Sequence, residues 1–237
     1  SDNNAGVSAD PSDAEKRASV RLELAGGYFS RGQFSTALDE IKLALAAKPD
    51  MGAAYNMRGL VYAAMGEDLL AEESFERAMS LNPRDADAMH NRAWFKCQRG
   101  QYDDADRLFE QAIATPQYRD LARSLMAQGI CYARAGRMVP AEQKLLRAYE
   151  VDPTNPTTAY NLADVLYRRS ELERARFYVR RVNDNEELSN AQTLWLAARI
   201  ENKAGNRNAV EAFGRQLRAR FPQSPQAQAY DSGRFND

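Results

Sequence analysis

Small, apolar and turn-forming residues recur along this chain with a period of about 34 positions. The stretch RGQFSTALDEIKLAL, residues 31 to 45, returns as RGQYDDADRLFEQAI, residues 99 to 113, and the two copies begin 68 positions apart, which is twice 34. A fixed period of roughly 20 to 50 residues indicates one structural unit that is stacked several times. The pattern therefore predicts a repeat architecture before it predicts any single element.

The residues that mark each period suit a pair of helices. Gly59 and Ala71 are small, which lets two antiparallel helices cross closely. Gly66 lies just past the first helix, where a positive φ is cheap only for glycine, and Pro83 cannot extend the second helix. The same marks recur at Gly32, Gly100, Gly136 and Gly205, at Ala37, Ala105, Ala141 and Ala175, and at Pro49, Pro153 and Pro222, with Ser170 in place of one glycine.

A large residue early in each period, followed by Gly, Tyr, Ala, Phe, Ala and Pro, resembles the tetratricopeptide repeat. This resemblance implies an all-α fold, a right-handed α-solenoid of antiparallel helix pairs. We expect a repeat domain over 15–224 with six repeats, at about 18–51, 52–85, 86–119, 122–155, 156–189 and 191–224. Residues 1–14 are small and polar, which predicts a flexible tether. Residues 225–237 have room for a short capping helix over repeat six.

The charge balance bounds the kinds of partner. The chain has 237 residues, of which 32 are basic and 33 acidic, for a formal net charge of -1. Nothing global therefore attracts nucleic acid or an anionic membrane surface, and we expect partner recognition to be local. No stretch approaches the roughly 20 apolar residues that span a bilayer.

Residues that enzymes use are scarce in this sequence. The single histidine, His90, has no partner arrangement for acid–base or nucleophilic chemistry, and no glycine-rich phosphate loop, HExxH or CxxC motif is present. We therefore predict no enzymatic activity and no cofactor. The sharpest alternative is a zinc site of His90, Cys97 and Cys131, but no fourth ligand is visible, so packing of these side chains is the favoured interpretation.

Cys97 and Cys131 are the two cysteines of the chain. Both lie near the ends of first helices in neighbouring predicted repeats, where their Cα atoms could come within the ~4.4 to 6.8 Å that a disulfide needs. Two buried free thiols are an equally good interpretation. An oxidising compartment would favour the bridge.

The run LYRRSELERARFYVRR, residues 166 to 181, interleaves arginines with aromatic residues. Nucleic-acid binders use that combination. Tyr167, Phe177 and Tyr178 hold repeat positions, however, so the arginines are what remains for the solvated face. With a net charge near zero, a structural role is the favoured interpretation.

In tetratricopeptide repeats the concave wall is drawn from fixed positions of each first helix, a convention that the resemblance supplies. These positions are mostly apolar in repeats one to four and turn polar in repeats five and six. The predicted partner-binding groove consists of Leu22, Phe29, Asn56, Leu60, His90, Trp94, Met126 and Ile130. An exposed apolar wall of this extent indicates a partner, unless curvature or the N-terminal segment covers it.

The chemistry of that wall favours one kind of ligand. Chaperone-tail receptors with this repeat hold a carboxylate with a clamp of Lys and Asn, and only Asn56 matches here. We therefore expect an apolar or amphipathic segment of a partner protein, bound through its side chains, and not an acidic tail.

Longer stretches carry a narrower resemblance. From about residue 17 to 235 the chain looks like the type IV pilus biogenesis and stability lipoproteins, the PilF/PilW family of secretin pilotins. The matching stretches include YFSRGQFSTALDEIKLAL and LMAQGICYARAGRMVPAEQKLLRA, and the segments WLAARIENKAGN and RFPQSPQAQ depart from a generic repeat and carry the narrower match.

The resemblance implies an adaptor at the periplasmic face of the bacterial outer membrane, lipid-anchored in the full precursor. Its implied partner is an outer-membrane secretin, whose localisation and assembly it assists, and we expect a monomer that binds no nucleic acid. No cysteine lies near Ser1, so we expect the anchor and any export signal to have been removed or replaced. The alternative is a generic tetratricopeptide scaffold for another envelope or cytosolic assembly.

Overall fold

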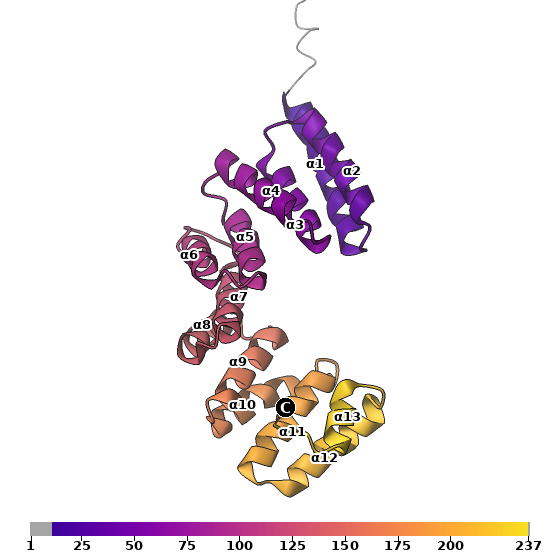
Figure 1. Ribbon diagram of the computed structural model, residues 1–237, viewed down its shortest axis with the longest axis vertical. Helices are drawn as coiled ribbons and strands as arrows, with labels where there is room; N and C mark the ends of the chain where they lie inside the picture. Colours follow the sequence, from indigo (N-terminus) through magenta and orange to yellow (C-terminus); the bar gives the residue numbers. More distant parts are fainter. Residues whose placement is uncertain (1–10, 237) are drawn as a thin grey trace, which may run out of the picture. The chain divides into compact units, whose positions relative to one another are not determined.

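The computed structural model describes residues 11–236, which form thirteen α-helices and, within that range, no strand (Figure 1). In chain order the helices are α1 (Pro11–Ser30), α2 (Phe34–Ala47), α3 (Gly52–Ala64), α4 (Asp68–Leu81), α5 (Ala86–Gln98), α6 (Tyr102–Ile113), α7 (Leu121–Arg134), α8 (Met138–Val151), α9 (Pro156–Arg168), α10 (Leu172–Asn183), α11 (Ala191–Ala204), α12 (Arg207–Arg220) and α13 (Pro225–Asp231).

Consecutive helices pack in pairs, from α1 with α2 to α11 with α12, which confirms the predicted all-α repeat array. The pairs fall into two compact units. Unit one ends at Tyr118 and contains α1 to α6, and unit two begins at Arg119 and contains α7 to α13. Within each unit the first helix of a pair also packs on the second helix of the preceding pair, as α3 does on α2 and α11 on α10.

Small residues occur where paired helices cross because the helices leave no room for a side chain there. A Cβ atom on Gly59 of α3 would lie 2.6 Å from the ring of Phe75 of α4. One on Gly129 of α7 would lie 2.6 Å from Cγ of Leu145 of α8. Neither distance is compatible with ordinary packing, so the close approach of the helices depends on glycine at both positions.

The turns inside the pairs use left-handed backbone. Gly66 has a φ of 77°, and after it the Glu67 N–H donates to the Tyr62 carbonyl at 2.9 Å. Ser170, which stands where the sequence lacks a glycine, adopts the same conformation with a φ of 61°. A side chain in this region costs about 1 kcal/mol. The turn between α9 and α10 therefore adopts the same left-handed conformation although serine is less favourable there than glycine.

Ion pairs connect successive helix pairs within a unit. In unit one, Glu72 of α4 pairs with Arg92 and Lys96 of α5, at 2.6 and 3.3 Å. In unit two, Arg176 of α10 pairs with Glu201 of α11 at 2.7 Å. Each of these ion pairs links the second helix of one pair to the first helix of the next.

The N-terminal boundary differs from the prediction. Helix α1 begins at Pro11, so residues 11–14 are helical and do not belong to a tether; residues 1–10 lie outside the described part of the chain. Proline suits the first helical position because its missing N–H has no partner there, and Asp13 in the first turn favours the helix dipole.

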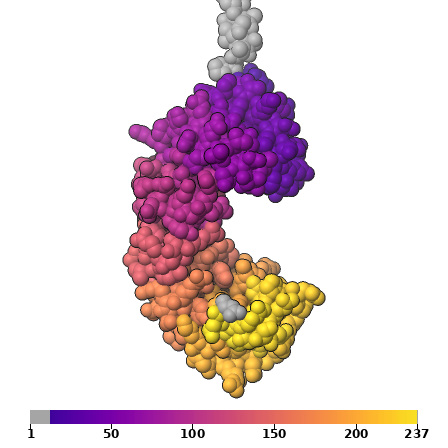
Figure 2. Space-filling view, viewed as in Figure 1, coloured from indigo at the N-terminus to yellow at the C-terminus, as the bar shows by residue number. Residues whose placement is uncertain are grey.

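The predicted C-terminal capping helix is confirmed. The Ser224 hydroxyl caps α13 by accepting from the Ala227 N–H at 3.0 Å, and the helix packs on α11 and α12. A Cβ on Gly214 of α12 would lie 2.0 Å from the ring of Tyr230, so the absence of a side chain there lets α13 dock. Figure 2 shows these C-terminal residues, in yellow, lying against the orange surface of the helices before them.

Candidate protein-binding surface

In unit one, Leu22 and Phe29 of α1 are both partly buried. They pack against a buried cluster that includes Ala25, Ala37 and Ile41. Each side chain therefore has one side in the core of the first helix pair and part of its surface open to solvent. An anchor that is already held by core contacts loses little conformational freedom when a partner covers the rest of it.

The equivalent positions of α3 and α5 continue this character. Leu60 of α3 is partly buried against Phe75 and Phe95, and Trp94 of α5 is also partly exposed. Asn56, at the start of the same surface, accepts a hydrogen bond from the Asn91 amide at 3.2 Å. The amide oxygen of Asn56 is thus engaged inside unit one, and the apolar side chains are the main candidates for partner contact.

Among the predicted groove residues of unit one, His90 alone is buried. Its side chain is only 4% exposed, and its ring meets Phe109 of α6 edge-on, with centroids 5.8 Å apart. A large aromatic on the paired helix covers the position, so His90 is a packing residue here. Position within the repeat alone did not reveal this neighbour.

In unit two, Met126 and Ile130 of α7 are partly buried against the cluster that includes Leu145 and Leu162. The Met126 sulfur accepts a weak hydrogen bond from the Asn155 amide at 3.9 Å. Both side chains retain exposed surface. They have the same half-buried character as the apolar residues of unit one.

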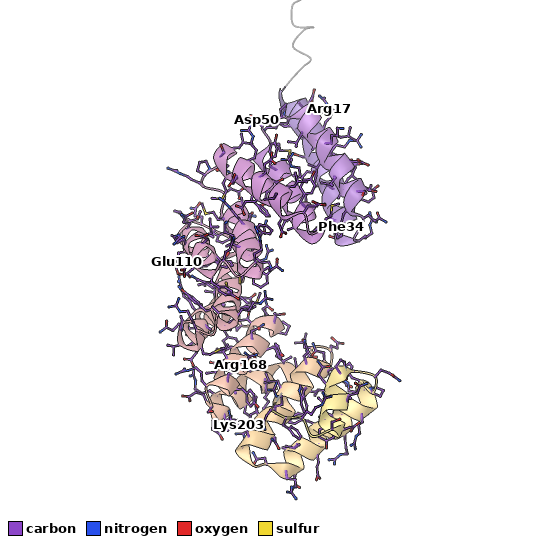
Figure 3. The ribbon with its side chains drawn as sticks, viewed as in Figure 1. Arg17, Phe34, Asp50, Glu110, Arg168 and Lys203 are labelled. Atoms are coloured by element: carbon purple, nitrogen blue, oxygen red, sulfur yellow. The ribbon has the colours of Figure 1, made fainter. Side chains whose placement is uncertain are left out.

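The corresponding positions of α9 and α11 carry charged side chains beside aromatic rings. Asp164 pairs with Arg168 one turn later, at 3.2 Å, and burial raises the pKa of the Asp164 carboxyl. The ring of Tyr167 is covered by the guanidinium of Arg199 at 5.1 Å and the ammonium of Lys203 at 5.0 Å. Figure 3 labels Arg168 at the end of α9 and Lys203 near the end of α11. These side chains satisfy one another and offer few apolar contacts.

The C-terminal segment also reaches α11, which the sequence did not predict. The ring of Phe235 stacks on the indole of Trp195, with centroids 5.1 Å apart and an interplanar angle of 29°. The Arg199 Nε donates to the Phe235 carbonyl at 2.9 Å. Phe235 lies beyond the last repeat, so no periodic position marks it.

The basic and aromatic run of residues 166 to 181 spans the end of α9 and most of α10, and it is only partly buried. Tyr167 of α9 is buried, whereas Phe177 of α10 is 54% exposed although it holds a repeat position. Arg181 lies over the rings of Phe177 and Tyr149, at 5.7 and 6.0 Å. The aromatic–arginine contacts at this face therefore lie at the surface of unit two.

Cys97 and Cys131 are both buried, and neither is a free thiol. Their pairing with each other stays a prediction. Among residues 11–236, no three His, Cys, Asp or Glu side chains are grouped as metal ligands. Over the same range no helix is long and apolar enough to cross a membrane.

Comparison with known proteins adds to this geometry. Models of the tetratricopeptide repeat match residues 52–85, 74–107 and 97–156. In sequence, the chain is 23% identical over 211 residues to the type IV pilus assembly protein PilF of Pseudomonas aeruginosa, which covers 89% of this chain and 83% of that protein.

Solved structures agree with the sequence match. The crystal structure of PilW, a widely conserved type IV pilus biogenesis factor, has a TM-score of 0.82 at 28% identity and covers 90% of this chain and 97% of that chain. The structure of Pseudomonas aeruginosa PilF has a TM-score of 0.79 at 22% identity, with 93% and 99% covered. The chain is thus a tetratricopeptide-repeat protein that resembles the PilF and PilW type IV pilus factors over most of its length.

Proposed function

We propose that this protein is a non-enzymatic adaptor of type IV pilus assembly that acts as a pilotin, helping the pilus secretin to reach and assemble in the outer membrane. The observation that carries the proposal is the match to PilF and PilW, in sequence and in structure, over about nine tenths of the chain. A match of this length extends well beyond one or two shared repeats.

The half-buried apolar side chains support binding to a protein segment. In unit one, Leu22, Phe29, Leu60 and Trp94 lie on first helices with part of their surface exposed. Covering such anchors contributes about 25 cal/mol per Å² of apolar surface removed from water. We propose an apolar or amphipathic segment of the secretin as the ligand, with a few large side chains contributing most of the affinity. In unit two, Met126 and Ile130 offer the same chemistry.

The proposed location is the periplasmic face of the outer membrane, with a lipid anchor on the full precursor. The resemblance to PilF and PilW supports this placement. The alternative is a scaffold for a different assembly, which would use the same apolar side chains for another partner. The identity of the protein recovered from the envelope separates the two.

A pull-down from envelope extract tests the proposal with a matched pair of variants. Leu60→Gln alters a groove anchor, whereas Leu69→Gln makes the same change at a leucine of the same unit that is 84% exposed and lies outside the predicted groove. We expect the parent chain and Leu69→Gln to recover a secretin as the main protein, and Leu60→Gln to lose it with unchanged helix content. Recovery by Leu60→Gln and loss by Leu69→Gln would place the binding surface elsewhere. A different main protein would favour the scaffold.

A further inference from the structure

On the last helix pair, the C-terminal segment of the chain contacts α11 in the way that a bound peptide could. Trp195 and Arg199 of α11 stand at the concave-wall positions of repeat six, and Phe235 covers both. The Tyr230 ring meets Phe235 edge-on, with centroids 6.2 Å apart. The ring of Phe235 therefore sits between an indole and a phenol, and its carbonyl is held by a guanidinium.

A short turn after α13 brings Phe235 to this position. Helix α13 ends at Asp231, the chain reverses at Gly233 with a φ of 67°, and the Arg234 N–H closes the turn by donating to the Ala229 carbonyl at 2.9 Å. Beyond Arg234, Phe235 contacts α11 through the Arg199 hydrogen bond and the Trp195 ring, and it contacts the Tyr230 ring of α13. Any aromatic residue in an extended segment could make the same three contacts.

Space beside Phe235 is available for the residues that would flank such an aromatic group. An open pocket of about 540 Å³ adjoins the ring and is lined by Asn202, Arg207, Glu211 and Tyr230 among others. Its lining is mostly polar side chains at the ends of α11 and α12. A main chain passing through it would find donors and acceptors, which suits an extended peptide better than a compact apolar ligand.

We propose that Trp195, Arg199 and Tyr230 form a subsite for an aromatic residue of an extended peptide segment, which Phe235 occupies in cis and a partner's aromatic residue takes by displacing it. Tethering gives Phe235 a high effective concentration, so a contact that is weak in isolation suffices to keep the subsite closed. The subsite uses none of the proposed apolar anchors and does not require the partner to be a secretin.

Tryptophan fluorescence of the full chain tests the subsite without any pilus component. The chain has two tryptophans, so in a Trp94→Phe background Trp195 is the only indole reporter. Phe235→Ala should expose the indole to water and shift its emission to the red. Phe235→Leu, which keeps apolar bulk but removes the stacked ring, should shift it in the same direction and serves as a second variant if the first loses structure.

The opened subsite should then bind an added peptide. The capped peptide acetyl-Gly-Arg-Phe-Asn-amide, which copies residues 233–236, should reverse the red shift saturably at millimolar concentration, and the same peptide with Ala in place of Phe should not. Adding Arg199→Gln should weaken the peptide about tenfold, because a charged donor to the carbonyl is lost. Unchanged emission in both Phe235 variants, or no saturable reversal by the aromatic peptide, would overturn the proposal.

Discussion

Replacing Arg176 by methionine tests how strongly the last two helix pairs of unit two depend on a buried charge pair. The Arg176 guanidinium of α10 donates two hydrogen bonds to the Glu201 carboxylate of α11, Nε to Oε2 and Nη2 to Oε1, both 2.7 Å long. The side chain of Glu201 is 8% exposed and that of Arg176 is 16% exposed. Methionine keeps most of the aliphatic stem and removes only the charge and its donors.

The expected loss in the free energy of unfolding depends on the groups that remain around the Glu201 carboxylate. Leaving a buried charge without its partner costs about 3 to 5 kcal/mol. The Asn206 amide still donates to Glu201 at 2.7 Å, and the rim of the pair is partly solvated, so we expect the lower end, about 3 kcal/mol at pH 7. For a chain of this size that corresponds to a fall in Tm of about 6 to 12 °C.

The pH dependence gives a second, independent signature. Arg176 holds the pKa of Glu201 below its ordinary value. A carboxyl with a depressed folded pKa stabilises the fold above its unfolded pKa of about 4.3, and that stabilisation is lost as the pH falls through the folded value. In the variant the main group that lowers the pKa of Glu201 is gone, while burial still raises it against the Asn206 hydrogen bond and the charge of Arg180, so the protonated carboxyl is better tolerated than in the parent. The difference in stability between parent and variant should therefore shrink below about pH 4.

Urea unfolding followed by far-UV circular dichroism at pH 7 and at acidic pH measures both effects. Glu173→Gln is the matched control, because Glu173 pairs with the same guanidinium at 2.6 Å but is 87% exposed. Its loss should cost less than about 1 kcal/mol. The reasoning is refuted if Arg176→Met lies within about 1 kcal/mol of the parent at pH 7, or if the difference does not diminish on acidification.

Three further predictions concern packing, the cysteines and a turn. Gly59→Leu should lower the free energy of unfolding by about 3 kcal/mol or more, because the leucine side chain would overlap the ring of Phe75. Gly27→Leu, on the exposed face of α1, should not, and equal melting temperatures of the two variants would contradict the close helix crossing. Thiol titration of the denatured, unreduced protein should find no free thiol if Cys97 pairs with Cys131, and reduction should cost about 2 to 4 kcal/mol; two reactive thiols would end that idea. Ser170→Gly should raise and Ser170→Val lower the free energy of unfolding, by about 1 kcal/mol each, since the φ of 61° favours glycine; urea unfolding of the two variants checks the order.

Much of the fold could be predicted because its signals are local or periodic. Gly59 has no side chain, and a second helix can approach closely only at such a position. The close crossing can therefore be predicted from this residue alone. Ser170 was identified as the missing turn residue from the period alone, and its left-handed backbone agrees. Ser224 followed by Pro225 is likewise a local signal for the start of the capping helix, because a capping hydroxyl and a proline at the first helical position both favour a helix N-terminus.

The surroundings of individual side chains were decided only by the tertiary structure. His90 occupies a repeat position typical of the concave wall, yet Phe109 from the paired helix covers it. Phe177 is a large apolar residue of the kind found in cores, yet it is mostly exposed. Phe235 holds no periodic position and stacks on Trp195, forty residues earlier in the chain. The period determines which backbone positions face one another, because helix geometry is local. Which side chain is buried depends on the volume and reach of residues brought together from distant parts of the sequence, and only the packed helices determine that.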